Sequence, residues 1–449
     1  MSALDDTNND LRTAGGLASP WCGSVGSIRV SAREQRRSTR YSMSSIAVEK
    51  VYVVCALVYL SGAFVGVSET PHTVSRLSAS NFGELALTIV VFLLGGMFIL
   101  RSWRSFVRGL RDCKWVLVLI GLAMTSSLWA SDPMFTFRKA VVTAGATAIG
   151  IYFGSRFRRD DQVDILSYTL TLLAAMSVIM VLWFPQYGID YAYSSAAWRG
   201  VFVTKNTLAK AMVLGVLAVV VSSRKSLKDG FARFVWVAGF GALVVLSRSA
   251  TAVVVGSVLL VIILTGPILR SRVTVLVPTT VAAFFVVAGL VTAFADQRDA
   301  LLAALGRDPT LTGRIEIWRA VLVEIGKKPW LGYGFDSFWQ GMAGPSMTVV
   351  AAVHWITPHS HNGFLDLCLD LGVLGLLTFG VGFVLRFRTA ILDYRASRQR
   401  TAMWPLVFLS FLLLYNLTET SLLFPPQLYW ALYAAATVRG LREVDECPA

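Results

Sequence analysis

Residues 250–267 read ATAVVVGSVLLVIILTGP and contain no charged side chain. A helix of this length crosses a hydrocarbon core about 30 Å thick. Similar apolar runs recur along the chain, which is 55% hydrophobic and 15% charged, whereas an average soluble protein is about 25% charged. The short alternating segments typical of a membrane β-barrel do not occur. We therefore predict an all-α, polytopic membrane protein.

Twelve apolar runs are predicted to be transmembrane helices within a domain that covers residues 46–442. The predicted spans are 47–67, 85–101, 115–131, 139–154, 163–184, 205–222, 232–247, 250–267, 273–295, 363–387, 402–420 and 426–441. The chain shows no internal repeat.

The positive charges alternate from loop to loop. Of the 41 Lys and Arg residues, 28 fall in the two tails or in one set of short loops. Positively charged loops remain in the cytoplasm, so we predict that both termini are cytoplasmic. The net charge of +14 is then an orientation signal, and no motif indicates nucleic-acid binding. The basic loops are Arg101–Lys114, Arg156–Arg159, Arg224–Arg233, Arg270–Arg272 and Arg386–Arg400.

The N-terminal segment differs from the rest of the chain. It is polar and lacks the apolar core of about 7–15 residues that a secretory signal needs. We interpret residues 1–45 as a disordered cytoplasmic tail and residues 443–449 as a second, short cytoplasmic tail; a start of translation at Met43 is the alternative for the first. The five cysteines show no CxxC spacing, and none lies in a loop predicted to be external, so no disulfide framework is indicated.

The largest predicted external loop is residues 296–362. Within it, Thr312 can cap a helix in which Ile315, Trp318, Leu322 and Ile325 recur at steps of three and four residues. This helix either lies along the membrane surface or packs on the helical bundle.

Four external cations point to an anionic ligand. Arg199, Lys205, Arg248 and Arg314 all fall on the predicted outer side. A single Arg at the end of a span often only reaches toward lipid headgroups. Several cations on the same side favour a bound polyanion, because one guanidinium group can donate two hydrogen bonds to phosphate oxygens.

His361 is the candidate general base, since an imidazole accepts a proton near neutral pH. The alternative is a loop histidine satisfied by nearby backbone groups. A zinc site formed by His354, His359 and His361 is a weaker hypothesis, because spacing of two residues in a loop does not place ligands on one helix face.

Further polar residues could support the site. Asp366, in the tenth predicted span, could orient His361 or an arginine, since acids within a membrane need a partner. Glu316 could pair with Arg314 or Arg319. Tyr333 belongs to a group of external aromatic residues that suit either the membrane interface or a sugar ring.

Three stretches resemble the superfamily of O-antigen ligases and bacterial polysaccharide polymerases, especially the rhizobial-type exopolysaccharide polymerases. The resemblance covers about residues 115–420. The stretches are Trp198-Arg199-Gly200-Val201-Phe202-Val203-Thr204-Lys205-Asn206, then Thr312-Gly313-Arg314-Ile315-Glu316-Ile317-Trp318 with Pro329-Trp330-Leu331-Gly332-Tyr333-Gly334, and finally His361-Asn362 with Gly372 and Gly375.

The resemblance implies a metal-independent, inverting glycosyltransferase without a cofactor in the bacterial inner membrane. Its donor would be an oligosaccharide on undecaprenyl pyrophosphate. Arg199, Lys205, Arg248 and Arg314 would bind the pyrophosphate, and His361 would take the proton of the acceptor hydroxyl. The supporting residues would be Asn362, Asp366, Glu316 and Tyr333.

Four alternatives remain for the function. A polymerase would use a growing glycan as acceptor, with a chain-length regulator as a further partner, whereas a ligase would use lipid A core. A secondary transporter also fits twelve spans, but many transporters contain repeated halves, which this chain lacks. A structural or sensor membrane protein would leave the clustered His and Arg residues unexplained.

Overall fold

The computed structural model describes residues 32–63, 82–191, 196–223, 230–270, 313–342, 344–424 and 427–439. Residues 49–449 form one compact unit, and every contact reported below lies within it. The predicted ninth span, 273–295, the start of the external loop and the C-terminal tail lie outside the described residues.

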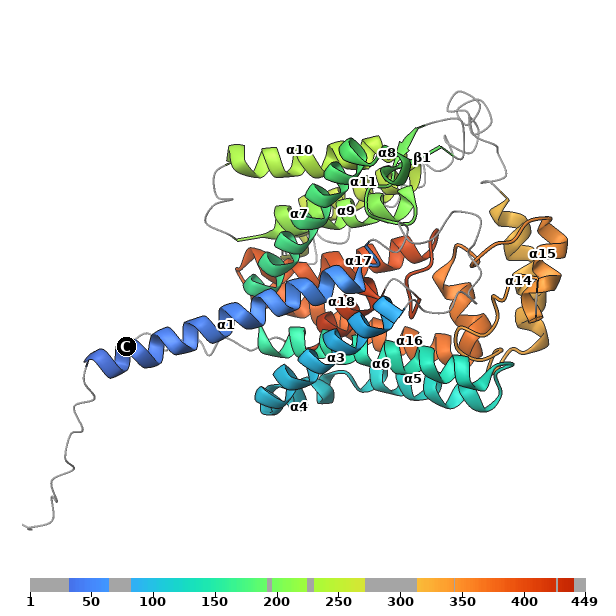
Figure 1. Cartoon of the computed structure of the whole chain (residues 1–449), viewed down its shortest axis with the longest axis horizontal. Helices are drawn as coiled ribbons and strands as arrows, with labels where there is room; N and C mark the ends of the chain where they lie inside the picture. The colour runs from blue at the N-terminus through green and yellow to red at the C-terminus, as the bar shows by residue number, and fades with distance from the viewer. Residues whose placement is uncertain are drawn as a thin grey trace, which may run out of the picture. The chain divides into compact units, whose positions relative to one another are not determined.

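The described part is helical apart from one short pair of strands, as predicted for an all-α chain (Figure 1). The longer helices are α1 (Ala32–Leu60), α3 (Phe82–Arg101), α4 (Trp103–Asp112), α5 (Lys114–Thr125), α6 (Pro133–Arg156), α7 (Arg159–Trp183), α9 (Lys205–Val221), α10 (Gly230–Leu246), α11 (Ala250–Thr265), α14 (Arg314–Lys327), α16 (Gly363–Ala396), α17 (Trp404–Asn416) and α18 (Leu428–Thr437). The short elements are η1 (Ser126–Leu128), α8 (Pro185–Gly188), β1 (Ile189–Asp190), β2 (Ala197–Trp198), η3 (Gly266–Arg270), η4 (Gly344–Ser346), α15 (Met347–Val353) and η5 (Arg400–Met403).

Each predicted span that falls on described residues overlaps a helix. Within the described ranges, only Gly83–Arg101, Arg159–Trp183 and Gly363–Ala396 are both long and apolar enough to cross a membrane, so the count of twelve stays a prediction. Helix α1 begins at Ala32, inside the segment expected to be disordered. The span predicted over 402–420 ends earlier, because α17 stops at Asn416 and residues 417–427 connect it to α18.

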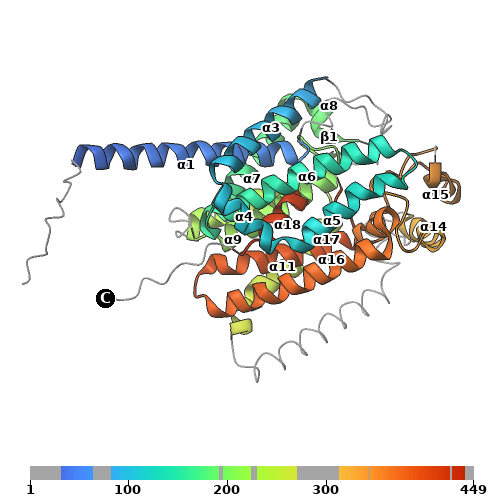
Figure 2. The ribbon, with the colours of Figure 1, turned by 90° about the horizontal axis from the view of Figure 1, so that it is seen from below.

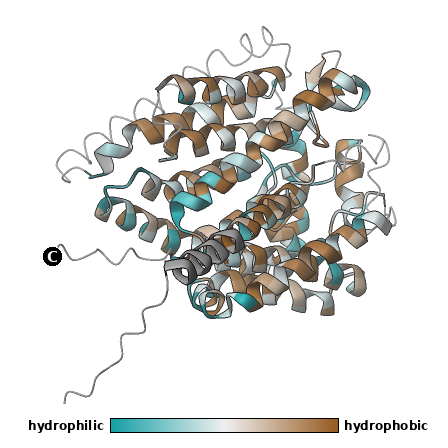
Figure 3. Cartoon of the chain, turned by 60° about the vertical axis from the view of Figure 1, so that its left-hand side comes forward, coloured by the Kyte–Doolittle hydropathy of each residue, from teal (hydrophilic) through white to brown (hydrophobic). Residues whose placement is uncertain are grey.

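Apolar side chains both fill the core and cover the outside. Figure 3 shows hydrophobic residues along most helices and hydrophilic residues at many of their ends and connections. Trp430 and Tyr152 are fully buried, whereas Leu93 and Leu100 on α3 are 69% and 73% exposed. An exposed apolar helix face of this kind suits contact with lipid.

Helices α6 and α18 approach each other closely. A Cβ atom on Gly150 of α6 would lie 2.2 Å from the carbonyl oxygen of Ala431 on α18. Gly154, one turn further on, faces the Ala435 carbonyl in the same way. Small residues spaced four apart allow membrane helices to pack backbone against backbone.

The connections fall into two groups that match the predicted alternation. In the basic group, Asp160 accepts hydrogen bonds from Ser223 (2.8 Å) and Thr401 (2.6 Å), and Arg159 pairs with Asp393 (2.7 Å). In the other group, Thr136 donates to the carbonyl of Phe335 (3.0 Å). Connections that were assigned to one side of the membrane are therefore in contact with one another.

In the described part of the loop predicted to be external, called the external loop below, helices α14 and α15 lie together at one end of this unit (Figures 1 and 2). Helix α14 is capped by Gly313, and Thr312 lies outside the described residues. The predicted apolar face is wrong in part: α14 packs on α15 and α16 through Ile317, Val321 and Glu324, while Leu322 is 57% exposed.

Helix α16 is broken at Gly372, which has φ 65° and ψ −169°. A positive φ suits glycine, because a Cβ atom is strained there. The freed backbone groups bond to residues 329–334 of the external loop. Tyr333 N–H donates to the Leu369 carbonyl (2.7 Å), and Val373 N–H donates to the Pro329 carbonyl (2.7 Å). Gly334 to Asp370 and Leu374 to Trp330 add two more such bonds.

Candidate active site

His361 lies just before the first residue of α16. Asn362 caps this helix, and its side-chain oxygen accepts hydrogen bonds from the N–H groups of Phe364 (3.0 Å) and Leu365 (3.2 Å). Asn is among the preferred N-cap residues because it satisfies N–H groups that have no partner within the helix. Asn362 therefore supports the site by fixing where the helix starts, and His361 lies immediately before this cap residue.

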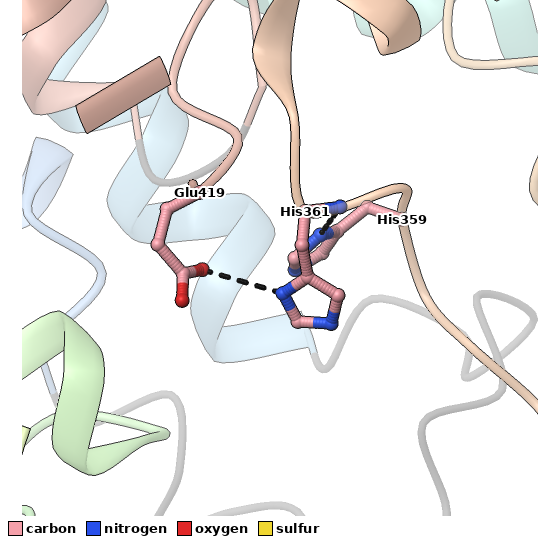
Figure 4. Close-up of side chains that lie close together, drawn as sticks. All are labelled: His359, His361 and Glu419. Carbon is pink, nitrogen blue, oxygen red and sulfur yellow. Dashed lines mark hydrogen bonds and ion pairs between the residues drawn. The ribbon is translucent and has the colours of Figure 1, made fainter. Parts of the chain in front are cut away.

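The imidazole of His361 faces a carboxylate. Nδ1 of His361 lies 3.5 Å from Oε2 of Glu419, in the connection between α17 and α18 (Figure 4). The backbone N–H of His361 donates to Nδ1 of His359 (3.1 Å), and the two rings meet edge to face. With Nδ1 of His361 turned toward an anion, Nε2 is the nitrogen that can accept a proton.

Glu419 brings together segments that are far apart in the sequence. Its Oε1 accepts from Nη2 of Arg314 (3.1 Å) and from Nδ2 of Asn206 (3.0 Å). Arg314 also donates through Nη1 to the carbonyl of Thr418 (2.6 Å). The start of α14, the start of α9 and His361, two residues before α16, thus meet at one carboxylate.

Glu419 carries a negative charge in this setting. Burial raises the pKa of its carboxyl group, but the hydrogen bond and electrostatic attraction from His361, with smaller contributions from His359 and Lys210, outweigh burial and lower the pKa to about 2. An anionic carboxylate beside Nδ1 holds the ring in one orientation and stabilises a positive charge on it.

Two predicted phosphate ligands are sequence neighbours of residues in or beside this cluster. Lys205 precedes Asn206 at the start of α9, and Arg248 precedes Ser249 at the start of α11. The hydroxyl of Ser249 donates to Oδ1 of Asn206 (2.9 Å), so these two helix starts are joined beside Glu419. Arg248 is exposed and has a positive φ of 51°.

Arg199 is held by backbone carbonyl groups. Its side chain donates to the carbonyls of Tyr187 (2.8 Å) and Val203 (3.3 Å), and the residue is 9% exposed. These bonds fix the segment between β1 and α9.

Three predicted supporting residues have other partners or positions. The Asp366 carboxylate accepts from Trp339 Nε1 (2.9 Å), the Ser360 N–H (3.1 Å) and the Thr420 hydroxyl. It therefore anchors the loop before His361, and its hydrogen bonds go to these three residues and not to the imidazole or an arginine.

Tyr333 donates to Oε2 of Glu324 (2.8 Å), in the small apolar core of the external loop. Glu316 is exposed on α14. One of its two expected partners, Arg314, is bound to Glu419 instead.

The sequence analysis missed Glu419 and Lys210. Each is a charged residue within or beside an apolar run. The same pattern indicated a functional role for Asp366 and could have indicated one for these two residues. Lys210 is buried in α9, where its ammonium group donates to the Ser421 hydroxyl (2.7 Å) and lies 4.6 Å from the centre of the Tyr429 ring.

One group of side chains has the composition of a metal site. Ligand atoms of His359, His361 and Glu419 lie within 4.8 Å of one another. His354, the third predicted zinc ligand, is instead exposed at the end of α15. A metal ion bound here would compete with Arg314 for the carboxylate.

Comparison with known proteins points to one family. Residues 233–380 match the family model described as O-antigen ligase. Over 332 residues the chain is 24% identical to "Exopolysaccharide production protein ExoQ" of Rhizobium meliloti, and the match covers 69% of this chain and 72% of that protein. The chain is thus similar to the O-antigen ligases and to ExoQ.

A second similar protein is "Putative polysaccharide ligase" of Rickettsia felis. It is 31% identical over 110 residues, which are 24% of this chain and 27% of that protein. The resemblance found from the motifs is thus confirmed, and the similarity supports a membrane enzyme of the polysaccharide ligase or polymerase type.

Proposed function

We propose that this enzyme transfers oligosaccharide from undecaprenyl pyrophosphate to a growing exopolysaccharide on the periplasmic face of the bacterial inner membrane. The observation that carries the proposal is the meeting of Arg314 and His361 at Glu419, next to the positions of Lys205 and Arg248. This arrangement combines a candidate base with groups suited to a diphosphate.

His361 starts the reaction in this proposal. Its Nε2 takes the proton of the acceptor hydroxyl while that oxygen attacks the anomeric carbon of the donor sugar. The bond between this carbon and the pyrophosphate oxygen breaks with inversion, and the electron pair leaves with the lipid pyrophosphate. Glu419 stabilises the imidazolium that forms.

The arginines predicted to bind the pyrophosphate stabilise the negative charge on the leaving group. Because pyrophosphate is already an activated leaving group, the step needs no metal ion. Loss of one preorganised contact of this kind typically costs about 3 kcal/mol, or roughly a hundredfold in rate.

The name of the Rhizobium meliloti relative refers to exopolysaccharide production, and this favours the polymerase over the ligase. The ligase is the second candidate and would take lipid A core as its acceptor. The similarity to O-antigen ligases and ExoQ favours both of these enzymes over the secondary transporter.

The deciding experiment supplies the purified protein with a short oligosaccharide on undecaprenyl pyrophosphate and no other acceptor. A ladder of longer lipid-linked products is expected. A reaction that begins only when lipid A core is added would indicate the ligase instead.

His361→Ala and Arg248→Ala are each expected to lower the rate at least about a hundredfold while the protein still inserts and accumulates. Arg319→Ala, on the exposed side of α14, is the matched control and should retain the wild-type rate. Full-length polymer from both site variants would refute the assigned roles.

A further inference from the structure

Arg314, the cation that the external loop brings to the site, already has an anionic partner. Its guanidinium binds the Glu419 carboxylate at 3.1 Å, and the two side chains are only 15% and 12% exposed. A diphosphate that enters the site therefore meets an arginine that is occupied, and must compete with Glu419 for it.

The two oxygens of Glu419 serve different partners. Oε1 faces Arg314 and Asn206, whereas Oε2 faces Nδ1 of His361. The charge of one carboxylate is thus divided between a cation and the candidate base. When Arg314 leaves, more of that negative charge acts on the imidazole and strengthens it as a base.

We propose that Glu419 is a positioning residue. Its carboxylate binds Arg314 while the site is empty and releases Arg314 to the diphosphate when the donor binds. Arg314 moves from the carboxylate to the phosphate oxygens, to which a guanidinium can donate two hydrogen bonds. Glu419 keeps its contact with His361, so binding of the donor makes Nε2 a better proton acceptor. This inference rests on the proposed function and adds a coupling between donor binding and catalysis.

The test separates binding from turnover. Binding of undecaprenyl pyrophosphate is measured with the full-length protein in detergent and EDTA, which keeps metal ions away from His359, His361 and Glu419. Glu419→Gln is expected to tighten this binding at least about threefold, because Arg314 loses its charged competitor and the pair is largely buried. A purely structural role would weaken binding or leave it unchanged.

Turnover is expected to change in the opposite direction. Glu419→Gln should lower kcat at least about tenfold, because the imidazolium loses its counter-charge. Glu419→Asp keeps the charge and should restore part of kcat. In Arg314→Ala/Glu419→Gln the gain in affinity should disappear. Glu84→Gln, at the exposed start of α3, is the matched control and should change neither quantity.

Unchanged or weaker binding by folded Glu419→Gln, or tighter binding with an unchanged kcat, would overturn the proposal. Should Glu419→Gln not fold, Arg314→Lys provides the second route: a lysine cannot form the forked bond to phosphate, so affinity should fall. If the wild-type protein transfers no glycan while Glu419→Gln still tightens binding, the proposed function fails and the exchange of Arg314 stands.

Discussion

Lys210 places an ammonium group inside α9, next to the connection that carries Glu419. Lys210→Met should preserve the melting temperature, because methionine fills a similar volume and has no charge to desolvate. Turnover should fall about tenfold, since the segment that carries Glu419 loses the hydrogen bond between Lys210 and Ser421 that positions it. Both quantities are measured on one preparation, with Lys114→Met at the exposed start of α5 as control. A variant with full turnover would limit Lys210 to packing.

Glu324 gives the external loop a dependence on pH. Its carboxylate binds Lys327 (2.7 Å), Thr348 (2.7 Å) and Tyr333 (2.8 Å). Burial raises the pKa of Glu324, but these three partners outweigh it and hold the pKa below its usual 4.5. Because the folded pKa is the lower one, the stabilisation is complete above pH 4.5 and is lost as the pH falls through the folded pKa.

Hydrogen exchange of residues 314–353, corrected for the intrinsic effect of pH, should therefore accelerate below about pH 4. Glu324→Gln should abolish that acceleration and cost about 1–3 kcal/mol at neutral pH, because polar partners are left unsatisfied. Equal protection in both proteins at neutral pH would contradict the role given to this carboxylate.

At the residue scale, the sequence allowed His361 and Arg314 to be predicted as site residues but not the carboxylate between them. Residue type and position near a span end identify a candidate base or a phosphate ligand. The choice between Asp366 and Glu419 as partner of His361 depends on how the connection after α17 folds back onto the start of α16. Local pattern contains no information on that long-range contact.

At the scale of elements, the break in α16 depends on one residue. A Cβ atom on Gly372 would lie 2.2 Å from the Trp330 backbone, in addition to the strain of a positive φ. Gly372→Ala should lower the free energy of unfolding by at least about 2 kcal/mol and reduce activity. Gly380→Ala is the matched control, since a Cβ atom there meets nothing within 4 Å. Equal melting temperatures of the two variants in detergent would rule out this role.

Hydropathy predicted helices well, because each apolar run must satisfy its own backbone hydrogen bonds in lipid. Hydropathy did not predict the features that depend on how elements pack against one another. The predicted face of α14 was wrong in part because that helix rests on α15 and α16 through Ile317 and Val321. The Gly372 position was recognised as part of a motif, yet the pattern gave no indication that its break pairs with residues 329–334.

At the scale of the whole molecule, the distribution of basic loops predicts orientation. Alkaline phosphatase, which is active only outside the cytoplasm, should be active when inserted at residue 342 and inactive when inserted after Gln399. A fluorescent protein at the C-terminus should fluoresce. The reverse pattern would place the candidate active site in the cytoplasm and remove the basis for a periplasmic donor.

The four backbone hydrogen bonds between residues 329–334 and the broken part of α16 restrict how far this segment can move. Residues 329–334 cannot move away from α16 as a hinged lid unless those bonds break. Under the proposed function, a bulky acceptor must therefore reach His361 without displacing this part of the loop.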